Sequence, residues 1–360
     1  MRLLIGLMSG TSMDGIDAAL VDVDTQHLLG ALTRPYGQEC RLFLEEILKH
    51  EQVSPGTLSQ LNTLLGREFA KAAQDVLIKT AHDPKDIIAI GSHGQTLCHD
   101  ATAPIPYTIQ LGCAHTIAEL TGICVVADFR TRDLVLDGQG APFAPLYHQA
   151  LFGALERPMA VLNIGGIANV TYLHDGLNGH DVGPGNCLMD AWTQKHCGQG
   201  YDAGGEWAAT GGVILPLLEA LLADPYFQAP TPKSLGKEYF SKTWLTRHLQ
   251  GGYAPKDVQA TLLALTARTV ADDLKKFPIP LKRLVLCGGG AHNKRLLHVL
   301  KQECPGLLIE TSASYGIDPD YVEAMMFAWF ADQALNGVSL DFTGITGSRR
   351  SAVYGAIYPK

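Results

Sequence analysis

The stretch from Ile5 to Asp22 reads IGLMSGTSMDGIDAALVD, and this pattern decides the architecture expected of the chain. The apolar runs Leu3–Leu7 and Ile16–Val23 have the length of β-strands, and the small and polar residues of Met8–Gly15 favour a bend between them. Glycine lacks a Cβ, so the backbone of such a bend can come close to a ligand. Its hydroxyl and carboxylate groups suit a triphosphate with Mg²⁺. A plain hairpin turn has a similar composition, so both interpretations stay open for this segment alone.

Two later segments repeat the glycine-rich pattern. Met159–Leu173 reads MAVLNIGGIANVTYL, which again predicts a strand, a glycine turn and a strand. Leu284–Leu297 reads LVLCGGGAHNKRLL, a strand that passes through three glycines into a helical pattern. Backbone N–H groups and a helix N-terminus at such a junction can bind a nucleotide, although neither segment matches the dinucleotide or P-loop motif. The three junctions predict one nucleotide cleft assembled from two lobes.

Length and composition agree with this prediction. The chain has 360 residues, more than a single core usually contains, so two lobes are expected. Its net charge of −8 argues against nucleic acid or an anionic membrane as a partner. The eight cysteines are scattered without a C-x₂-C pair, which is typical of free thiols in a reducing compartment. No apolar run approaches the ~20 residues of a membrane helix, and the N-terminal run is too short for a signal peptide. We therefore expect a cytoplasmic protein.

Polar side chains follow two predicted strands, where ligands gather in α/β sheets. Ser92, His93 and Gln95 come after Ile87–Ile90, and Asp128 and Arg130 come after Ile123–Ala127. Three prolines in Pro225–Gly236 indicate a surface loop. Apolar residues at helical spacing predict the helices Leu58–Leu77, Leu188–His196, Gly212–Ala223, Val258–Phe277 and Val322–Leu335.

Several motifs together resemble one family. They are GLMSGTSMDG (6–15), GSHGQT (91–96), ADFR (127–130), QGAP (139–142), NIGG (163–166), DVGPGN (181–186), LMDAW (188–192) and CGGG (287–290). The chain resembles the anhydro-N-acetylmuramic acid kinases, within the superfamily of sugar kinases, actin and heat-shock ATPases, over essentially its whole length.

The resemblance implies an α/β fold: a two-lobed, actin-like (ribonuclease H-like) ATPase with duplicated mixed sheets flanked by helices. Residues 1–140 and about 337–360 would form the first lobe, and residues 141–336 the second. ATP and a sugar would bind in the cleft between them.

The resemblance also implies the reaction. Such a kinase hydrolyses the ring of 1,6-anhydro-N-acetylmuramic acid and phosphorylates O6, giving N-acetylmuramic acid 6-phosphate and ADP in peptidoglycan recycling. Asp181, which opens the DVGPGN motif, would be the catalytic base that activates the attacking water. From the residues alone, an aspartate before glycines is more often a turn or capping residue.

Arg130 would hold the substrate's carboxylate, because a guanidinium offers a planar, bidentate fork. A surface ion pair is the alternative for this arginine. The other expected substrate ligands are His93, Gln95, Asp128 and Glu323. Either Asp14 or Asp17 would hold Mg²⁺ through water. The expected ATP contacts are Gly10, Thr11, Ser12, Met13, Asp14, Gly15, Ile16, Asp17, Gly165, Gly166, Asn169, Gly288, Gly289 and Gly290.

Two other functions stay open on the sequence. An actin-like, nucleotide-gated binding or assembly module would share the ATP cleft but would not need Asp181 or Arg130. A kinase of another small sugar would need a free hydroxyl acceptor and no water attack. The expected partner is a small molecule, and a homodimer through an apolar face of the second lobe is a further expectation.

Overall fold

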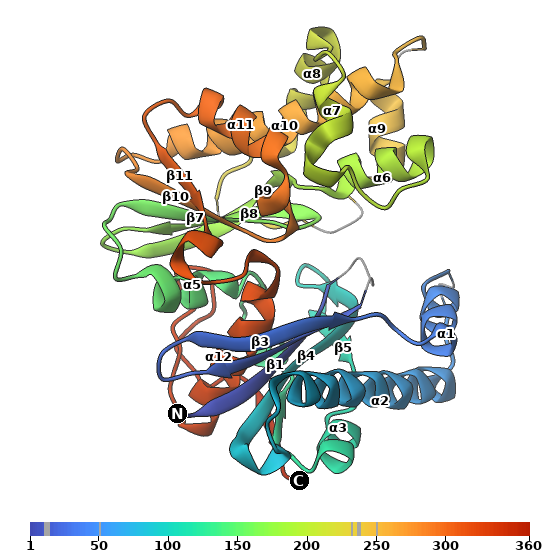
Figure 1. Ribbon diagram of the computed structural model, residues 1–360, viewed down its shortest axis with the longest axis vertical. Helices are drawn as coiled ribbons and strands as arrows, with labels where there is room; N and C mark the ends of the chain where they lie inside the picture. Colours follow the sequence, from blue (N-terminus) through green and yellow to red (C-terminus); the bar gives the residue numbers. More distant parts are fainter. Residues whose placement is uncertain (11–14, 50–51, 232, 236–238, 250) are drawn as a thin grey trace. The chain divides into compact units, whose positions relative to one another are not determined.

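The computed structural model describes residues 1–10, 15–49, 52–231, 233–235, 239–249 and 251–360 (Figure 1). The chain divides into two compact units. The first contains Met1–Tyr147 and Tyr321–Lys360, and the second contains His148–Asp320.

The first unit is built on a seven-stranded sheet of order β12-β6-β4-β1-β2-β3, with β5 paired to β4. Strands β1, β4 and β6 are parallel, whereas β2 is antiparallel to both β1 and β3. The strands are β1 (Leu3–Ser9), β2 (Ile16–Asp22), β3 (His27–Arg34), β4 (Ile87–Asp100), β5 (Tyr107–Leu111), β6 (Val125–Ala127) and β12 (Ala356–Tyr358).

The second unit repeats this arrangement. Its sheet has the order β11-β10-β7-β8-β9, with β8 antiparallel to β7 and β9, and β10 parallel to β7 and β11. Read as β9-β8-β7-β10-β11, it matches β3-β2-β1-β4-β6 pair for pair, so the expected duplicated mixed sheets are confirmed. The strands are β7 (Met159–Ile164), β8 (Ile167–Leu173), β9 (Leu177–Pro184), β10 (Arg283–Cys287) and β11 (Leu308–Thr311).

Helices flank both sheets. Those of the first unit are α1 (Gln38–Lys49), α2 (Pro55–Thr80), α3 (Ala114–Thr121), α4 (Thr131–Val135) and α12 (Val322–Leu335), while α5 (Ala144–Phe152) spans the boundary. Those of the second are α6 (Cys187–Cys197), α7 (Glu206–Ala209), α8 (Leu215–Leu222), α9 (Lys242–His248), α10 (Pro255–Lys276) and α11 (Lys294–Glu303). Among the helices of the described residues, none is long and apolar enough to cross a membrane.

Helix α12 packs directly against the first sheet. Ile5 and Leu7 of β1 belong to the apolar core that α2 completes, so Gly6 between them faces the opposite side, where α12 lies. A Cβ on Gly6 would lie 1.7 Å from the carbonyl oxygen of Ala324, and one on Gly91 would lie 1.9 Å from that of Phe327. Only glycine fits at these two positions, where β1 and β4 pack against the backbone of α12. The sequence grouped this helix with the second lobe, but the structure packs it in the first unit.

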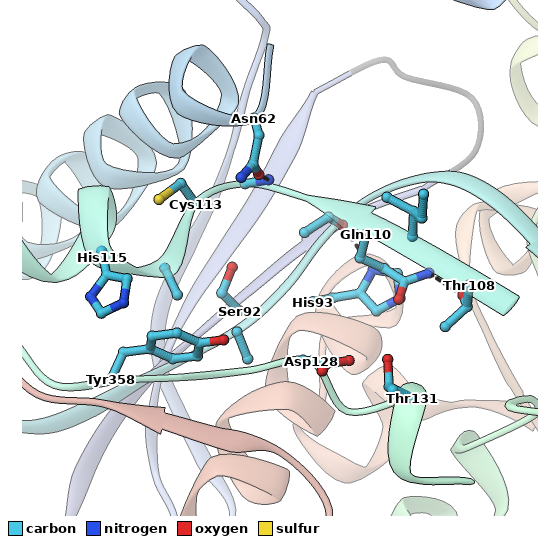
Figure 2. A pocket seen from close by; sticks show the side chains of 15 residues that line it. Asn62, Ser92, His93, Thr108, Gln110, Cys113, His115, Asp128, Thr131 and Tyr358 are labelled. Carbon is cyan, nitrogen blue, oxygen red and sulfur yellow. Dashed lines mark hydrogen bonds between the residues drawn. The ribbon is translucent and has the colours of Figure 1, made fainter. Parts of the chain in front are cut away.

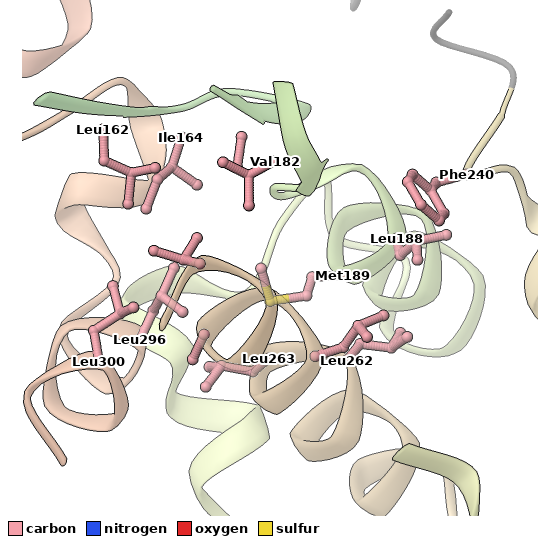
Figure 3. Close-up of a cluster of buried hydrophobic side chains, with 14 of the residues drawn as sticks. Leu162, Ile164, Val182, Leu188, Met189, Phe240, Leu262, Leu263, Leu296 and Leu300 are labelled. Atoms are coloured by element: carbon pink, nitrogen blue, oxygen red, sulfur yellow. The ribbon is translucent and has the colours of Figure 1, made fainter. Parts of the chain in front are cut away.

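The core of the second unit lies between its sheet and α6, α10 and α11 (Figure 3). Leu162 and Ile164 of β7 and Val182 of β9 are at most 2% exposed. Burial of each such side chain contributes about 1.5–3 kcal/mol, which fixes β7 and β9 and the loops that follow them. The helical partners in this core include Leu188, Met189, Leu262, Leu263, Leu296 and Leu300.

Strand β4 is much longer than the sequence suggests. The apolar run ends at Ile90, but the strand continues to Asp100, because residues 95–100 pair with β5. Ser92, His93 and Gln95 therefore lie within a strand and not beyond its end, which corrects the expectation. Asp128 and Arg130 do follow the end of β6, as expected.

Candidate active site

Gln95 forms hydrogen bonds at the start of the glycine loop between β1 and β2. Its Nε2 donates to Gly10 O at 3.2 Å, and its Oε1 lies 2.8 Å from Ser9 Oγ. Ser9 Oγ also lies 2.7 Å from Gly15 O and accepts a hydrogen bond from Tyr36 at 2.8 Å. Burial raises the pKa of Tyr36, which keeps its hydroxyl a donor. Gln95, 1% exposed, thus supports the start of the loop, and Ser9 Oγ connects that start to Gly15 at its end. The sequence predicted Gln95 as a sugar ligand, and that role stays a prediction.

Four predicted ATP contacts, Thr11, Ser12, Met13 and Asp14, lie outside the described residues. Ile16 is fully buried in the core. Asp17 is half-buried on β2, where its Oδ1 accepts a hydrogen bond from Thr33 at 2.6 Å. Asp17 is therefore the described carboxylate of the expected Mg²⁺ pair.

The side chains of His93 and Arg130 are joined by a hydrogen bond. The Nε of Arg130 donates to His93 Nε2 at 2.9 Å, and His93 Nδ1 donates to Gly94 O at 2.9 Å. Burial and the neighbouring guanidinium hold the pKa of His93 well below its usual range, so the ring is neutral and can accept from Arg130. The ring also packs on Phe327, with centroids 4.7 Å apart. Gly94 O therefore fixes the His93 ring through Nδ1, and the ring orients Arg130 through Nε2.

A second contact fixes the other arm of this guanidinium. Arg130 Nη1 donates to Gly140 O at 2.6 Å. The amide of Gly140 donates in turn to Asp133 Oδ2 at 2.7 Å, and Asp133 Oδ1 accepts from Thr346 at 2.8 Å. Asp133 is fully buried, and burial raises its pKa despite these hydrogen bonds. The QGAP motif thus serves as a backbone support for Arg130.

Asp128 stands at the mouth of a pocket of about 370 Å³ in the first unit (Figure 2). It is exposed and has a φ of +56°, a left-handed conformation that is costly for a non-glycine residue. His93 lines the same pocket. Glu323, half-buried in the first turn of α12, is absent from the pocket's described lining.

Asp181 lies on β9 of the second unit, beside an irregularity in the sheet. Asn169 pairs with Asp181 but its neighbour Ala168 pairs with Gly183, so Val182 is an extra residue. Such bulges redirect side chains and are frequent next to active sites. The structure therefore brings Asn169, a predicted ATP contact, opposite the predicted base.

The segment that follows the helix η3 (Pro225–Gln228) anchors Asp181 from the other side. The amide of Leu235 donates to Asp181 Oδ2 at 2.8 Å, and the amide of Asp181 donates to Lys233 O at 3.1 Å. The hydroxyl of Tyr226 donates to Asp181 O at 2.7 Å. The sequence predicted a surface loop here, but Tyr226 and Lys233 are more than nine-tenths buried. The described residues of this segment hold the carboxylate and the backbone of Asp181 in place.

His180, the neighbour of Asp181 on β9, belongs to a buried cluster around Asp273 of α10. His180 Nε2 lies 3.0 Å from both carboxylate oxygens of Asp273, and Tyr172 donates to Asp273 Oδ2 at 2.7 Å. Burial raises the pKa of Asp273, but the hydrogen bonds from His180 and Tyr172 and the charge of Lys233 outweigh it, so the net pKa is lowered. The cluster ties β8 and β9 to α10.

We expect Asp273→Asn to lower the free energy of unfolding by about 3 kcal/mol at pH 7, because it breaks a buried charged cluster. A lowered folded-state pKa gives stability that is present above the ordinary value of 3.8 and is lost as the pH falls through the folded-state pKa. The difference in the free energy of unfolding between the variant and the wild type should therefore become smaller below pH 4. Urea unfolding at pH 7 and at pH 3 measures this. Asp272→Asn, at a neighbour whose side chain is 45% exposed, is the control. A constant difference at both pH values would contradict this account.

The glycine motifs of the second unit lie together. The turn after β9 is hydrogen-bonded to the Gly165–Gly166 turn, through Gly185 N to Gly166 O at 2.9 Å and Asn186 N to Gly165 O at 2.8 Å. The start of α6 is thereby held beside that turn. The side chain of Asn186, the N-cap residue of α6, makes no capping hydrogen bond and instead donates from Nδ2 to Ile164 O at 3.1 Å.

The Gly288–Gly290 segment packs against Asn163 and Ile164 at the end of β7. A Cβ on Gly288 would lie 2.3 Å from Asn163 Oδ1, and one on Gly290 would lie 2.4 Å from Ile164. The segment does not enter a helix directly, because η4 (Gly289–His292) and the capping residue Asn293 precede α11. Close packing thus accounts for two of the glycines, whatever else they bind.

Sequence reasoning missed several supporting residues: Tyr36, Asp133, Tyr226, Lys233 and Asp273. Four of them act on a predicted site residue or its neighbour from a distant part of the chain, whereas Asp133 stands close to Arg130 in the sequence and acts on it through Gly140. No local motif marks them, since a lone tyrosine or buried aspartate carries no spacing signal.

The comparisons with known proteins agree with these motifs. The family model for anhydro-N-acetylmuramic acid kinase matches residues 2–360. The anhydro-N-acetylmuramic acid kinase of Legionella pneumophila (strain Philadelphia 1) is 54% identical over 361 residues, covering 100% of this chain and 99% of that protein. The chain belongs to the anhydro-N-acetylmuramic acid kinase family.

A second relative and a solved structure extend this result. The family member of Xylella fastidiosa (strain Temecula1) is 45% identical, covering 99% of this chain and 96% of that protein. Component A of the Acidaminococcus fermentans (R)-2-hydroxyglutaryl-CoA dehydratase has a TM-score of 0.51 at 12% identity, covering 92% of this chain and 97% of that one. The latter likeness concerns the fold alone.

Proposed function

We propose that this protein is an ATP-dependent kinase that opens the ring of 1,6-anhydro-N-acetylmuramic acid with water and phosphorylates O6. The products are N-acetylmuramic acid 6-phosphate and ADP, in the recycling of cell-wall peptidoglycan in the cytoplasm. The observation that supports this most is the carboxylate of Asp181, held by a backbone N–H on a bulged strand in a member of this family.

Asp181 acts as the general base. It takes a proton from a water molecule as that water forms a bond to the anomeric carbon and the bond from that carbon to O6 breaks. The oxygen O6 then attacks the γ-phosphorus of ATP, and ADP leaves. The leaving oxygen needs no separate acid, because the phosphoryl group takes up its electrons. Attack on the face opposite the bridge inverts the configuration at the anomeric carbon.

ATP is bound by the loop between β1 and β2 and by the glycine motifs of the second unit. Backbone N–H groups at such turns, together with the N-terminus of α6, suit phosphate oxygens. Asp17 is the described carboxylate that would hold Mg²⁺ through water, and the ion, when bound, would neutralise charge on the transferring group.

The direct test of this proposal is a turnover assay with ATP, Mg²⁺ and the anhydro sugar, followed by mass spectrometry of the products. The expected product is N-acetylmuramic acid 6-phosphate in equal amount to ADP. Hydrolysis of ATP without a phosphorylated sugar would contradict the proposal and favour a nucleotide-gated module.

Arg130 binds the carboxylate of the sugar's lactyl group. We expect Arg130→Lys to raise the KM for the sugar about a hundredfold and to leave the KM for ATP within twofold, because lysine keeps the charge but loses the fork. Steady-state kinetics in both substrates measures this. Arg132→Lys, at an exposed arginine two residues away, is the matched control. An equal rise in both KM values would argue against the assignment.

His93 positions Arg130. We expect His93→Phe to keep the ring packing on Phe327 but to lose the acceptor for Arg130, raising the KM for the sugar about tenfold with little change in melting temperature. His93→Gln restores an acceptor and should recover part of the loss. Because the histidine is neutral in the folded protein, the effect should be constant from pH 6 to pH 8. A pH-dependent effect, or no recovery in the glutamine variant, would count against this role.

A further inference from the structure

Strand β9 is an edge of the second sheet, and the backbone of Asp181 on this edge is held from outside the sheet. An edge strand leaves its outer N–H and C=O groups open unless something covers them. Here the amide of Asp181 donates to Lys233 O at 3.1 Å, and the hydroxyl of Tyr226 donates to Asp181 O at 2.7 Å. Both backbone groups of the proposed base are therefore engaged by two residues of one neighbouring segment.

The side chain of Lys233 joins these two residues to each other. Its Nζ donates to Tyr226 O at 3.3 Å and lies 4.5 Å from the centroid of the Tyr226 ring. A cation is attracted to an aromatic face, and more strongly where water is excluded. Asp181, Lys233 and Tyr226 thus form a closed ring of contacts. The ring runs from the amide of Asp181 through Lys233 and its ammonium group to Tyr226, and returns through the phenol to Asp181 O.

The ammonium group of Lys233 is costly to place here. Lys233 is only 8% exposed, and an ammonium group has three N–H donors to satisfy. Within the described part of the chain, its Nζ makes one long hydrogen bond and no ion pair with a carboxylate. Burial of a charge without a close partner of opposite sign is unfavourable, so packing alone does not account for a lysine at this position.

The charges that face Lys233 come from β9 and α10. Lys233 shares a cavity of about 150 Å³ with Asp272, Asp273 and Lys276 of α10. Burial lowers the pKa of Lys233 and the charge of Lys276 adds to this, whereas the charges of Asp273 and Asp181 oppose it, so the net pKa is lowered. Electrostatic coupling is mutual, so the cation favours the ionised form of Asp181 in turn.

Asp273 is the other carboxylate that this cation stabilises. Its oxygens already accept hydrogen bonds from Tyr172 and His180. The stabilisation of Asp273 is thus shared among three groups.

We propose that Lys233 is a positioning residue for the reaction: it fixes the backbone of Asp181 together with Tyr226, and its charge keeps the Asp181 carboxylate ionised. This inference rests on the proposed function, in which Asp181 is the general base. It gives Lys233 a role that acts through Asp181, without contact to the reacting atoms. A base accepts a proton only in its ionised form, so a nearby cation extends the pH range of activity toward acid.

Lys233→Met tests the charge in the full-length protein, because methionine is also long and unbranched but carries no charge. We expect kcat to fall about tenfold, with the KM values for ATP and the sugar within about twofold of the wild type. Without the cation the pKa of the base rises, so the acid limb of the pH profile of kcat should move to higher pH by roughly half a pH unit. Lys233→Arg keeps a cation on the Tyr226 ring and should recover most of the activity and the original acid limb.

Two further variants separate position from charge. Tyr226→Phe removes the hydroxyl that holds Asp181 O but keeps the ring beneath Lys233, so kcat should fall about threefold while the acid limb stays in place. Lys275→Met, at a lysine of α10 whose side chain is 56% exposed, is the matched control and should behave as the wild type.

The outcomes distinguish this inference from the function on which it rests. If the wild type phosphorylates the sugar but Lys233→Met leaves the acid limb in place, or loses no more activity than the control, the role of Lys233 is overturned and the kinase function stands. A lower melting temperature with an unmoved acid limb would likewise show a purely structural lysine. Should Lys233→Met not fold, an unchanged kcat in Tyr226→Phe overturns the inference. If the wild type forms no phosphorylated sugar, the proposed function fails and this inference fails with it.

Discussion

Replacing Asp181 with asparagine is expected to lower kcat about 10³-fold, the usual contribution of a general base. Asparagine has nearly the same shape, and its Oδ1 can still accept the hydrogen bond from Leu235 N, so the local structure should persist. The amide cannot take a proton from water, so the attack on the anomeric carbon loses its base. The KM values for both substrates should stay within about threefold, because the change affects the transition state more than binding.

Asp175→Asn is the matched control for this experiment. Asp175 is an exposed aspartate in the turn between β8 and β9 of the same unit, and its variant should retain full activity. Melting temperatures of both variants exclude loss of folding as the cause. A kcat within tenfold of the wild type in the Asp181 variant would rule out this carboxylate as the base.

Gly6→Ala is expected to lower the free energy of unfolding by about 3 kcal/mol or more, the largest effect on stability that we predict. The new Cβ would lie 1.7 Å from the carbonyl oxygen of Ala324, a backbone atom that no side-chain rotation can move. The sheet and α12 would have to separate, and overpacking of this kind is costly. For a unit of this size the melting temperature should fall by roughly 6–12 °C.

Gly56→Ala provides the control in the same unit. Gly56 lies in the first turn of α2, where the nearest atom to a new Cβ would be 3.9 Å away. Alanine favours a helix over glycine by about 1 kcal/mol, so this variant should melt at the same or a higher temperature. Equal melting temperatures for the Gly6 variant and the wild type would show that α12 does not cross β1 in the described way.

The parts of the fold that follow from local pattern were predicted from the sequence. The helix Val322–Leu335 has the predicted bounds, because its apolar residues allow no other element of that length. The hairpin of β7 and β8 was predicted from its glycine turn. The continuation of β4 beyond Gly94 was not, since its residues are polar and become a strand only by pairing with β5. The unit to which α12 belongs depends on long-range packing, which leaves no local pattern.

The candidate site shows the same division. The motifs predict roles for Asp181 and Arg130, but they do not show which groups hold these side chains in place. Gln95 and His93 stand two residues apart in one motif, yet Gln95 supports the start of a loop through Ser9 and Gly10, and His93 orients Arg130. Their partners Ser9 and Arg130 are distant in sequence, so the difference appears only once the sheet is formed.

The central claim is that a water molecule activated by Asp181 attacks the anomeric carbon while O6 takes the phosphoryl group. The most direct measurement is ¹³C and ³¹P NMR of the reaction in H₂¹⁸O, recorded before the anomers equilibrate. Our account predicts ¹⁸O on the anomeric carbon, unlabelled O6 in the phosphate ester, and the α-anomer formed first, since the 1,6-bridge is a β-linkage that is inverted. Absence of ¹⁸O from the anomeric carbon, or the β-anomer formed first, would contradict it.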